Sequence, residues 1–174
     1  MKKTVNAFDY AGDICKALKK GILLTTSVGE KVNTMTIGWG HIGIEWSRPI
    51  FVAYVRETRY TREMLDDSGE FTVNIPVGEY DPAILGFCGT KSGRDVDKIG
   101  AMNLHPVQSD VVHVPGIREF PLTLECKVIY KQKQDLSAIP EDILARYYPK
   151  DETGFQDYHY AYYGEIVNAY LITE

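Results

Sequence analysis

Short apolar segments rich in β-branched and aromatic residues recur along the chain, and each predicts a strand. These segments are Ile22–Val28, Val32–Trp39, Ile50–Val55, Phe71–Ile75, Val111–Val114, Leu122–Lys131 and Gly164–Ile172. Turn residues separate them, and Gly29-Glu30-Lys31 predicts a hairpin between the first two. Glycines interrupt Ile37–Gly43, where they indicate a bulge or a close approach by a ligand.

Helical spacing of apolar residues is confined to short stretches. Apolar residues four apart predict a helix over Ala7–Lys20. Three further helices are expected, over Arg59–Asp67 with Thr58 as N-cap, over Pro82–Phe87 behind Asp81, and over Ile139–Tyr147. Because strands outnumber helices and tight turns dominate, the pattern predicts a mainly β protein with an antiparallel sheet or barrel.

Composition narrows the class of protein. A length of 174 residues is typical of a single domain, and the net charge of −5 argues against binding to nucleic acid or to an anionic membrane. No apolar run approaches the ~18 residues of a transmembrane helix, and the start of the chain has no signal-peptide pattern. Three cysteines without paired spacing favour free thiols in a reducing, cytoplasmic compartment.

A candidate anion site lies in the segment Arg56–Arg62, which reads R-E-T-R-Y-T-R. Thr58 and Thr61 lie three apart at the start of a predicted helix, where free backbone N–H groups attract anions. Arg56 and Arg59 add forked donors. These features predict a phosphate site, and the alternative is an ordinary helix cap with solvated arginines.

The run Cys88–Lys98 predicts a second polar loop. It resembles a P-loop only superficially, because Thr90 stands where a P-loop requires glycine before the lysine. We therefore exclude nucleotide triphosphate hydrolysis and keep two alternatives, an anion-binding turn and a plain surface turn. Cys88 beside this loop is interpreted as a buried, inert thiol rather than an activated one.

No catalytic or metal-binding constellation emerges from the remaining residues. The four histidines lack zinc-site spacing, and the sequence shows neither a nucleophile elbow nor a carboxylate pair that can be localised. Trp39 and Trp46 are interpreted as core or interface residues. A flat, glycine-rich strand together with a phosphate site suggests a nucleotide-like cofactor.

Several runs, in this order, resemble the flavin-reductase-like, FMN-binding split-barrel family, and its flavoredoxin branch most of all. They are Val32–Gly40 (V-N-T-M-T-I-G-W-G), Arg48–Thr61, Phe71–Pro76, Cys88–Lys98 and Gly164–Leu171. The N-terminal helix and the tyrosine-rich segment Tyr147–Tyr163 match least.

The resemblance implies an antiparallel Greek-key split barrel with a few short helices, paired as a homodimer, with noncovalent FMN near the dimer interface. It implies that the strand carrying Asn33, Met35, Thr36 and Trp39 borders the isoalloxazine ring. It also implies two segments around the ribityl phosphate, one carrying Arg56, Thr58, Arg59 and Thr61 and the other carrying Cys88, Gly89, Lys91 and Ser92.

An FMN flavoprotein of electron transfer is therefore the expected function, with the redox chemistry supplied by the cofactor. Its electron donor would be NAD(P)H or a redox partner protein, and the absence of a Rossmann fingerprint excludes neither. The alternative is a non-catalytic FMN-binding carrier or sensor.

Overall fold

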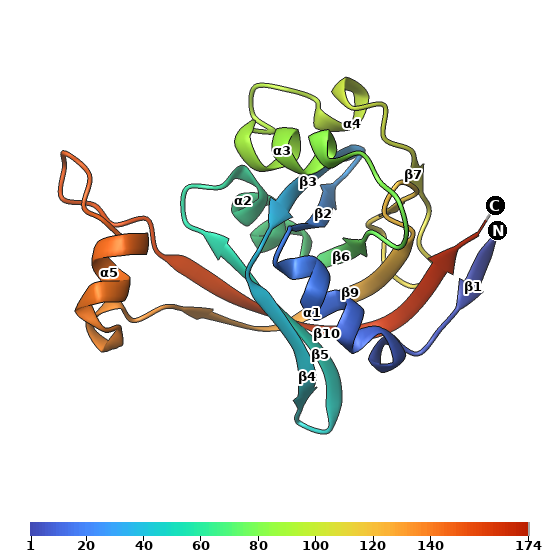
Figure 1. Ribbon diagram of the computed structural model, residues 1–174, viewed down its shortest axis with the longest axis horizontal. Coiled ribbons are helices and arrows are strands. Elements are labelled where there is room, and N and C mark those ends of the chain that lie inside the picture. The colour runs from blue at the N-terminus through green and yellow to red at the C-terminus, as the bar shows by residue number, and fades with distance from the viewer. Residues whose placement is uncertain (174) are drawn as a thin grey trace.

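The main feature of this computed structural model, which describes residues 1–173, is one antiparallel sheet. Its eight strands within those residues are β1 (Lys2–Thr4), β2 (Ile22–Val28), β3 (Lys31–Ile37), β4 (Gly40–Glu45), β5 (Arg48–Arg56), β6 (Glu70–Ile75), β9 (Leu122–Lys133) and β10 (His159–Ile172). The order is β3-β2-β6-β9-β10-β5-β4, and β1 pairs with the end of β10 (Figure 1). Along the described chain the outer strands β3 and β4 are not paired with each other, so the sheet is an open, split barrel rather than a closed one. The predicted fold class is confirmed.

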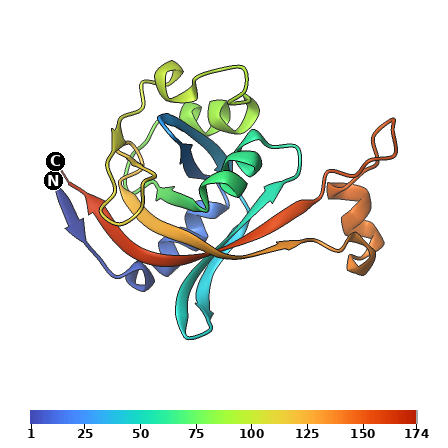
Figure 2. The same ribbon diagram turned by 180° about the vertical axis from the view of Figure 1, so that it is seen from behind.

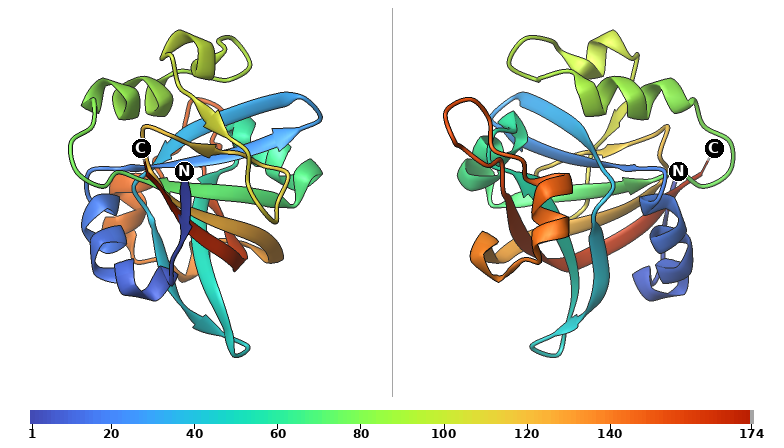
Figure 3. Two further views of the ribbon diagram at one scale, coloured as in Figure 1. Left: turned by 90° about the vertical axis from the view of Figure 1, so that its right-hand side faces the viewer. Right: turned by 60° about the vertical axis from the view of Figure 1, so that its left-hand side comes forward.

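Helices cover the sheet at several places. They are α1 (Ala11–Leu18), α2 (Tyr60–Ser68), α3 (Pro82–Thr90), α4 (Lys98–Ala101) and α5 (Glu141–Tyr147), with the 3-10 helices η1 (Ala7–Tyr10) and η2 (Leu136–Ala138) and a small β7–β8 ribbon (Pro106–Val107 and Gly116–Ile117). Figure 3 shows α3 and α4 together at one end of the molecule, away from α1. None of the helices among residues 1–173 has the length and apolar character needed to traverse a lipid bilayer.

The core explains how the helices are held. Ile14 and Leu18 of α1 are buried in the same cluster as Phe51 and Phe71 of the sheet. Each such side chain contributes about 1.5–3 kcal/mol when it is removed from water. A second cluster joins α3 to β2, and its buried members include Leu23, Ile84, Leu85, Cys88 and Phe120. This second cluster holds α3 against the sheet.

β10 is the longest strand and bends as it crosses the core (Figure 2). Its register against β9 shifts between Tyr163 and Gly164 and again between Ile166 and Asn168. A side chain at Gly164 would collide with the ring of Phe71, which is fully buried. Glycine is therefore required where the bulge brings the backbone of β10 against the core.

Residues 134–158, which we call the arm, leave the body of the molecule between β9 and β10 and carry η2 and α5 (Figure 1). The base of the arm is packed, because Tyr148 is buried and its hydroxyl donates to Gln134 Oε1 at 2.7 Å. The arm contains most of the tyrosine-rich segment that matched the family least. The rest of that segment, from His159 on, belongs to β10.

One predicted strand is wrong. Val111–Val114 is a bend rather than a strand, because its backbone N–H groups turn inward to a carboxylate instead of a neighbouring strand. The N–H groups of Asp110, Val111 and Val112 donate to the fully buried Glu125 side chain at 3.0, 2.7 and 2.9 Å. A carboxylate that accepts several N–H groups replaces a sheet ladder as their partner.

Element ends also differ from the predicted ones. α2 begins at Tyr60 with Arg59 as N-cap, so Thr58 is not the cap. α3 continues to Thr90, which places Cys88 and Gly89 in its last turn rather than in a loop. β3 ends at Ile37, and Trp39 lies in the short connection to β4. These shifts all fall at the edges of the pockets described below.

Candidate functional site

Two neighbouring pockets lie beside β3, one where β3 meets the start of α2 and the end of α3, and the other between β3, β5 and the start of β10. The first, which we call the α2 pocket, has a volume of about 140 Å³, and the predicted residues that line it are Met35, Thr58, Arg59, Thr61, Cys88, Gly89, Lys91 and Ser92. The second, the Trp39 pocket, has a volume of about 170 Å³ and includes Met35, Thr36, Trp39 and Arg56. Because Met35 and Arg59 line both, the two pockets are direct neighbours.

The start of α2 opens into the α2 pocket. Its N-cap, Arg59, has extended backbone and makes no side-chain cap hydrogen bond. The first N–H groups of a helix lack partners within the helix, and its dipole is positive at this end. Thr61 lies in this first turn and is 2% exposed. An anion in the α2 pocket would find unpaired backbone donors there.

Positive side chains surround the same pocket. Arg59 and Lys91 are exposed, whereas Lys98 is buried, and its ammonium donates to the carbonyl oxygens of Thr34 and Cys88 at 2.9 Å each. An ammonium group has three protons, so one remains for a ligand. Burial lowers the pKa of Lys98, and the nearby cation Arg59 lowers it further.

Cys88 is a packed thiol. It is 1% exposed, and burial raises the pKa of its thiol to about 11, while the neighbouring Lys98 acts in the opposite direction. The reactive thiolate is therefore almost absent near neutral pH. This result agrees with the interpretation of Cys88 as inert.

Aromatic rings form the wall of the Trp39 pocket. The Trp39 ring packs against those of Tyr147 and His159, with centroid distances of 5.1 and 4.8 Å. Trp39 is 39% exposed, so it is neither a core residue nor fully covered by the arm. Tyr54 of β5 completes this wall and meets His159 edge-on at 6.5 Å. A planar ligand would find an apolar, aromatic surface here.

His159 is neutral near pH 7. Burial lowers the pKa of its imidazole to about 4, and the positive charge of Arg56 adds to this effect. Its Nδ1 lies 2.8 Å from the Tyr148 hydroxyl, which in turn donates to Gln134 Oε1. Because that hydroxyl proton goes to Gln134, Nδ1 carries a proton and donates to Tyr148. Nε2 is therefore the acceptor nitrogen of the ring.

Two residues predicted to bind the phosphate, Arg56 and Thr58, make hydrogen bonds to the arm. The Arg56 guanidinium donates to the backbone carbonyls of Asp157 and Tyr147, and it lines the Trp39 pocket rather than the α2 pocket. The Thr58 hydroxyl donates to Asp157 Oδ2 at 2.8 Å, although Thr58 still borders the α2 pocket. Both groups thus have partners on the arm, which the sequence pattern did not indicate.

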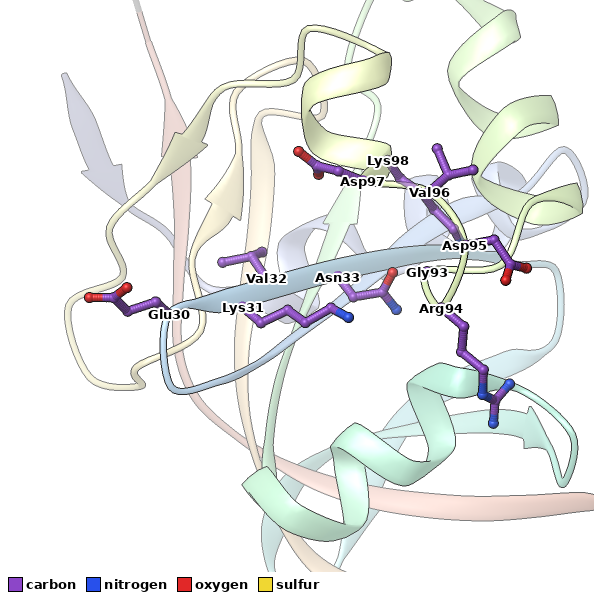
Figure 4. Close-up of a pocket in the computed structure, with 10 residues that line it drawn as sticks. All are labelled: Glu30, Lys31, Val32, Asn33, Gly93, Arg94, Asp95, Val96, Asp97 and Lys98. Atoms are coloured by element: carbon purple, nitrogen blue, oxygen red, sulfur yellow. The ribbon is translucent and has the colours of Figure 1, made fainter.

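Two residues of the predicted ring strand are also engaged by protein groups. The Thr36 hydroxyl donates to the Leu85 carbonyl at 2.7 Å, which ties β3 to α3. Asn33 is 3% exposed and lines a third pocket of about 360 Å³, which adjoins the α2 pocket through Gly93, Arg94 and Lys98 (Figure 4). Of the four residues predicted in this segment, Met35, Thr36 and Trp39 line the Trp39 pocket and Asn33 does not.

The pockets also contain residues that sequence reasoning did not select. Lys98 is the last residue of the D-V-D-K run, and nothing in that run indicates that it is buried. In the structure its ammonium donates to the Cys88 carbonyl oxygen. His159 and Tyr54 belong to strands that are far apart in the sequence and meet by pairing of β10 with β5. Among residues 1–173, no group of three or more His, Cys, Asp or Glu side chains could hold a metal ion.

A family model described as the flavin reductase like domain matches residues 16–174 of the chain. The chain belongs to this family. Membership supports a flavin as the cofactor, and the pair of pockets, one cationic and one aromatic, suits the two ends of such a molecule.

Curated relatives in the sequence comparison carry no assigned function in their names. An uncharacterized protein of Archaeoglobus fulgidus is 33% identical over 106 residues, covering 61% of this chain and 59% of that protein. The uncharacterized protein YddH of Escherichia coli is 29% identical over 111 residues, covering 62% of this chain and 58% of that protein. The matched part is thus less than two thirds of the length of either relative.

Solved structures with the same fold include flavoredoxins. That of Desulfovibrio vulgaris (Miyazaki F) aligns with a TM-score of 0.65 at 23% identity, covering 87% of this chain and 68% of the other. The flavoredoxin of Methanosarcina acetivorans gives 0.62 at 27% identity, with coverage of 87% and 68%. An FMN-binding domain of a flavin reductases-like enzyme from Shewanella baltica gives 0.63 at 16% identity, covering 98% and 77%. These likenesses support the split-barrel assignment.

Proposed function

We propose that this chain is a flavoprotein that holds FMN noncovalently and passes electrons through it. Its structural neighbours include a protein named flavoredoxin and an FMN-binding domain of a flavin reductases-like enzyme. The observation that carries the proposal is that a cationic pocket and an aromatic pocket lie side by side and share Met35 and Arg59. When bound, FMN supplies the redox chemistry, and the protein supplies binding and orientation.

The residues of the α2 pocket fit a phosphate monoester. The first turn of α2 offers backbone N–H groups, and Thr61 and Ser92 add hydroxyls. Arg59, Lys91 and the buried Lys98 add positive charge. A dianionic phosphate would gain charge-assisted hydrogen bonds from this set.

The Trp39 pocket fits the ring system. Met35, Trp39 and Tyr54 provide apolar surface, and the Nε2 acceptor of His159 belongs to a ring that lines the same pocket. Neutral imidazole at this place adds no charge next to the flavin. The arm holds this wall in place through the contacts that Arg56 makes with Tyr147 and Asp157.

FMN is proposed in preference to FAD. The basic residues Arg59, Lys91 and Lys98 and the first turn of α2 meet in the α2 pocket, which suits one phosphate group. The sequence carries no dinucleotide-binding fingerprint that would hold a second one.

The proposal also includes a homodimer. The β4–β5 hairpin exposes Ile44 and Trp46, which are 73% and 55% exposed. The Trp46 ring contacts those of Tyr130 and Tyr163 at centroid distances of 6.0 and 6.4 Å, so the apolar surface is continuous across three strands. An exposed apolar patch of this kind is typical of an interface.

The first test is the absorption spectrum of the purified protein, with the released chromophore identified by mass. A flavin spectrum and the mass of FMN are expected. FAD as the tightly bound species, or a protein that binds no flavin on titration, would contradict the proposal.

The electron donor is tested separately. Anaerobic stopped-flow mixing with NADH and with NADPH measures bleaching of the flavin absorbance, and bleaching by either supports a flavin reductase. If neither reduces the flavin, the donor is a redox partner protein or the chain is a non-catalytic carrier. Reduction by a reduced ferredoxin or flavodoxin distinguishes these two alternatives.

A further inference from the structure

Asn33 and Thr61 form a buried pair between β3 and the first turn of α2. The Asn33 amide nitrogen Nδ2 donates to Thr61 Oγ1 at 2.9 Å, and the two residues are 3% and 2% exposed. An amide nitrogen can only donate, so the threonine oxygen is the acceptor in this bond.

The pairing determines where the Thr61 hydroxyl proton can go. A hydroxyl has one proton, and here its oxygen already accepts from Asn33, so the proton must point elsewhere. Within residues 1–173 no protein acceptor pairs with that proton. Thr61 lines the α2 pocket together with Arg59, Lys91 and Ser92. The proton is therefore available to an acceptor in this pocket.

The other end of the same amide supports the loop that follows α3. A side chain at Gly93 would collide with Asn33 Oδ1 and would press on the Tyr60 ring at 3.1 Å. The backbone at Gly93 therefore lies directly against the Asn33 amide, and Figure 4 shows these two residues next to each other. Ser92 and Lys91, which line the α2 pocket, precede this contact.

We propose that Asn33 is a positioning residue for the phosphate of the flavin, acting through Thr61 and the 91–94 backbone rather than by touching the cofactor. The inference rests on the proposed function. It replaces the expectation that Asn33 borders the isoalloxazine ring, because its side chain is directed to α2 and the loop. The Asn33 amide orients the Thr61 hydroxyl. It also supports Gly93, next to the two further donors Lys91 and Ser92.

A double-mutant cycle tests this proposal, with FMN and riboflavin titrated into apoprotein. Asn33→Leu removes the amide at similar volume and should weaken FMN binding about tenfold, the effect of one lost hydrogen bond to a charged group, while riboflavin changes less than about twofold. In a Thr61→Val background the same Asn33→Leu change should have a much smaller effect on the ratio of FMN to riboflavin affinity. The hydroxyl through which Asn33 mainly acts is already absent there.

A matched control removes the hydroxyl of another buried hydrogen-bonded pair, which joins β2 to β3. Thr25 Oγ1 donates to Thr34 Oγ1 at 3.0 Å, away from the pockets, so Thr25→Val should lower stability without changing the FMN to riboflavin ratio. If Asn33→Leu does not fold, Asn33→Ala removes the amide without adding a charge or a larger side chain. FMN binding should again fall relative to riboflavin, because the Thr61 hydroxyl loses the group that orients it.

The inference is overturned if the unaltered protein prefers FMN and the Asn33 variants keep the same FMN to riboflavin ratio, or if Asn33→Leu lowers that ratio equally with and without Thr61. An unaltered protein that binds FMN no more tightly than riboflavin overturns the proposed phosphate site itself. The two failures are therefore distinguishable.

Discussion

The ammonium nitrogen of Lys98 lies 2.9 Å from the carbonyl oxygen of Cys88, and the same nitrogen lies 2.9 Å from the carbonyl oxygen of Thr34. One buried side chain thus ties the last turn of α3 to β3. The C-terminal end of α3 carries the negative end of the helix dipole, and the Lys98 ammonium contacts it at the edge of the α2 pocket. This arrangement allows a helix C-terminus to border a pocket proposed for an anion.

Lys98→Met should destabilise the protein. The substitution leaves two buried carbonyl groups without a donor, which costs about 2–4 kcal/mol in free energy of unfolding. The measurement is urea denaturation of the apoprotein. Lys91→Met is the matched control, because Lys91 is exposed and borders the same pocket, and it should change stability by less than about 0.5 kcal/mol. Equal stability of the two variants would mean that Lys98 does not hold α3 to β3.

Thiol labelling should distinguish the three cysteines. Cys15 is exposed, whereas Cys88 and Cys126 are buried, and burial raises the pKa of both buried thiols. A thiol-specific reagent at pH 8 should therefore modify one cysteine at once and the others only on denaturant addition. Cys88→Ser should keep flavin reduction within a few-fold. Fast labelling of two thiols, or a loss of reduction by orders of magnitude with FMN still bound, would indicate an active thiol.

Acid should weaken the protein through His159. The folded-state pKa of its imidazole is about 4, below its ordinary value of 6.5, so between these values only the unfolded chain binds the proton. Stability from this group is full above pH 6.5 and is lost as pH falls toward 4. We expect a loss of about 1–2 kcal/mol, less than the whole shift, because the ring lines an open pocket.

The comparison variant for this acid effect is His159→Gln, which cannot take up the proton. Urea midpoints measured at pH 7 and at pH 4.5 should differ less for His159→Gln than for the unaltered protein. Parallel losses in the two proteins would assign the acid sensitivity to other groups.

The sequence was most informative where local chemistry determines structure. The turn at Gly29 and the cap at Asp81 depend on neighbours a few residues away, and both are confirmed by the β2–β3 hairpin and by the Asp81 bond to the Ala83 N–H at 2.9 Å. The residues proposed for the phosphate also come from two short runs, and the structure brings most of these residues to one pocket.

Tertiary contacts determined the parts that the pattern did not predict. Val111–Val114 has the composition of a strand, yet Glu125 from β9 takes its N–H groups. Arg56 has the features of a phosphate ligand, yet carbonyls of the arm take its donors. In each case the hydrogen bonds are made with a group that is distant in sequence. The spacing of residues along the chain cannot predict such a partner.

The proposed homodimer leads to a further prediction. Ile44 and Trp46 are the most exposed large apolar residues of the β4–β5 hairpin, so a charge there would oppose burial in an interface. The unaltered protein should sediment as a dimer at micromolar concentration, and Ile44→Glu with Trp46→Glu should raise the dimer dissociation constant at least about a hundredfold. A monomer with bound FMN at that concentration would contradict the homodimer.

The most direct test of the central claim is titration of the apoprotein and its Thr61→Val variant with FMN and with riboflavin. Thr61→Val removes one hydroxyl donor at nearly constant volume, so FMN should bind about tenfold to a hundredfold more weakly, while riboflavin, which lacks the phosphate, should bind both proteins almost equally. Equal FMN affinities for the two proteins would remove Thr61 from the phosphate site, and a parallel loss of riboflavin binding would make its role structural.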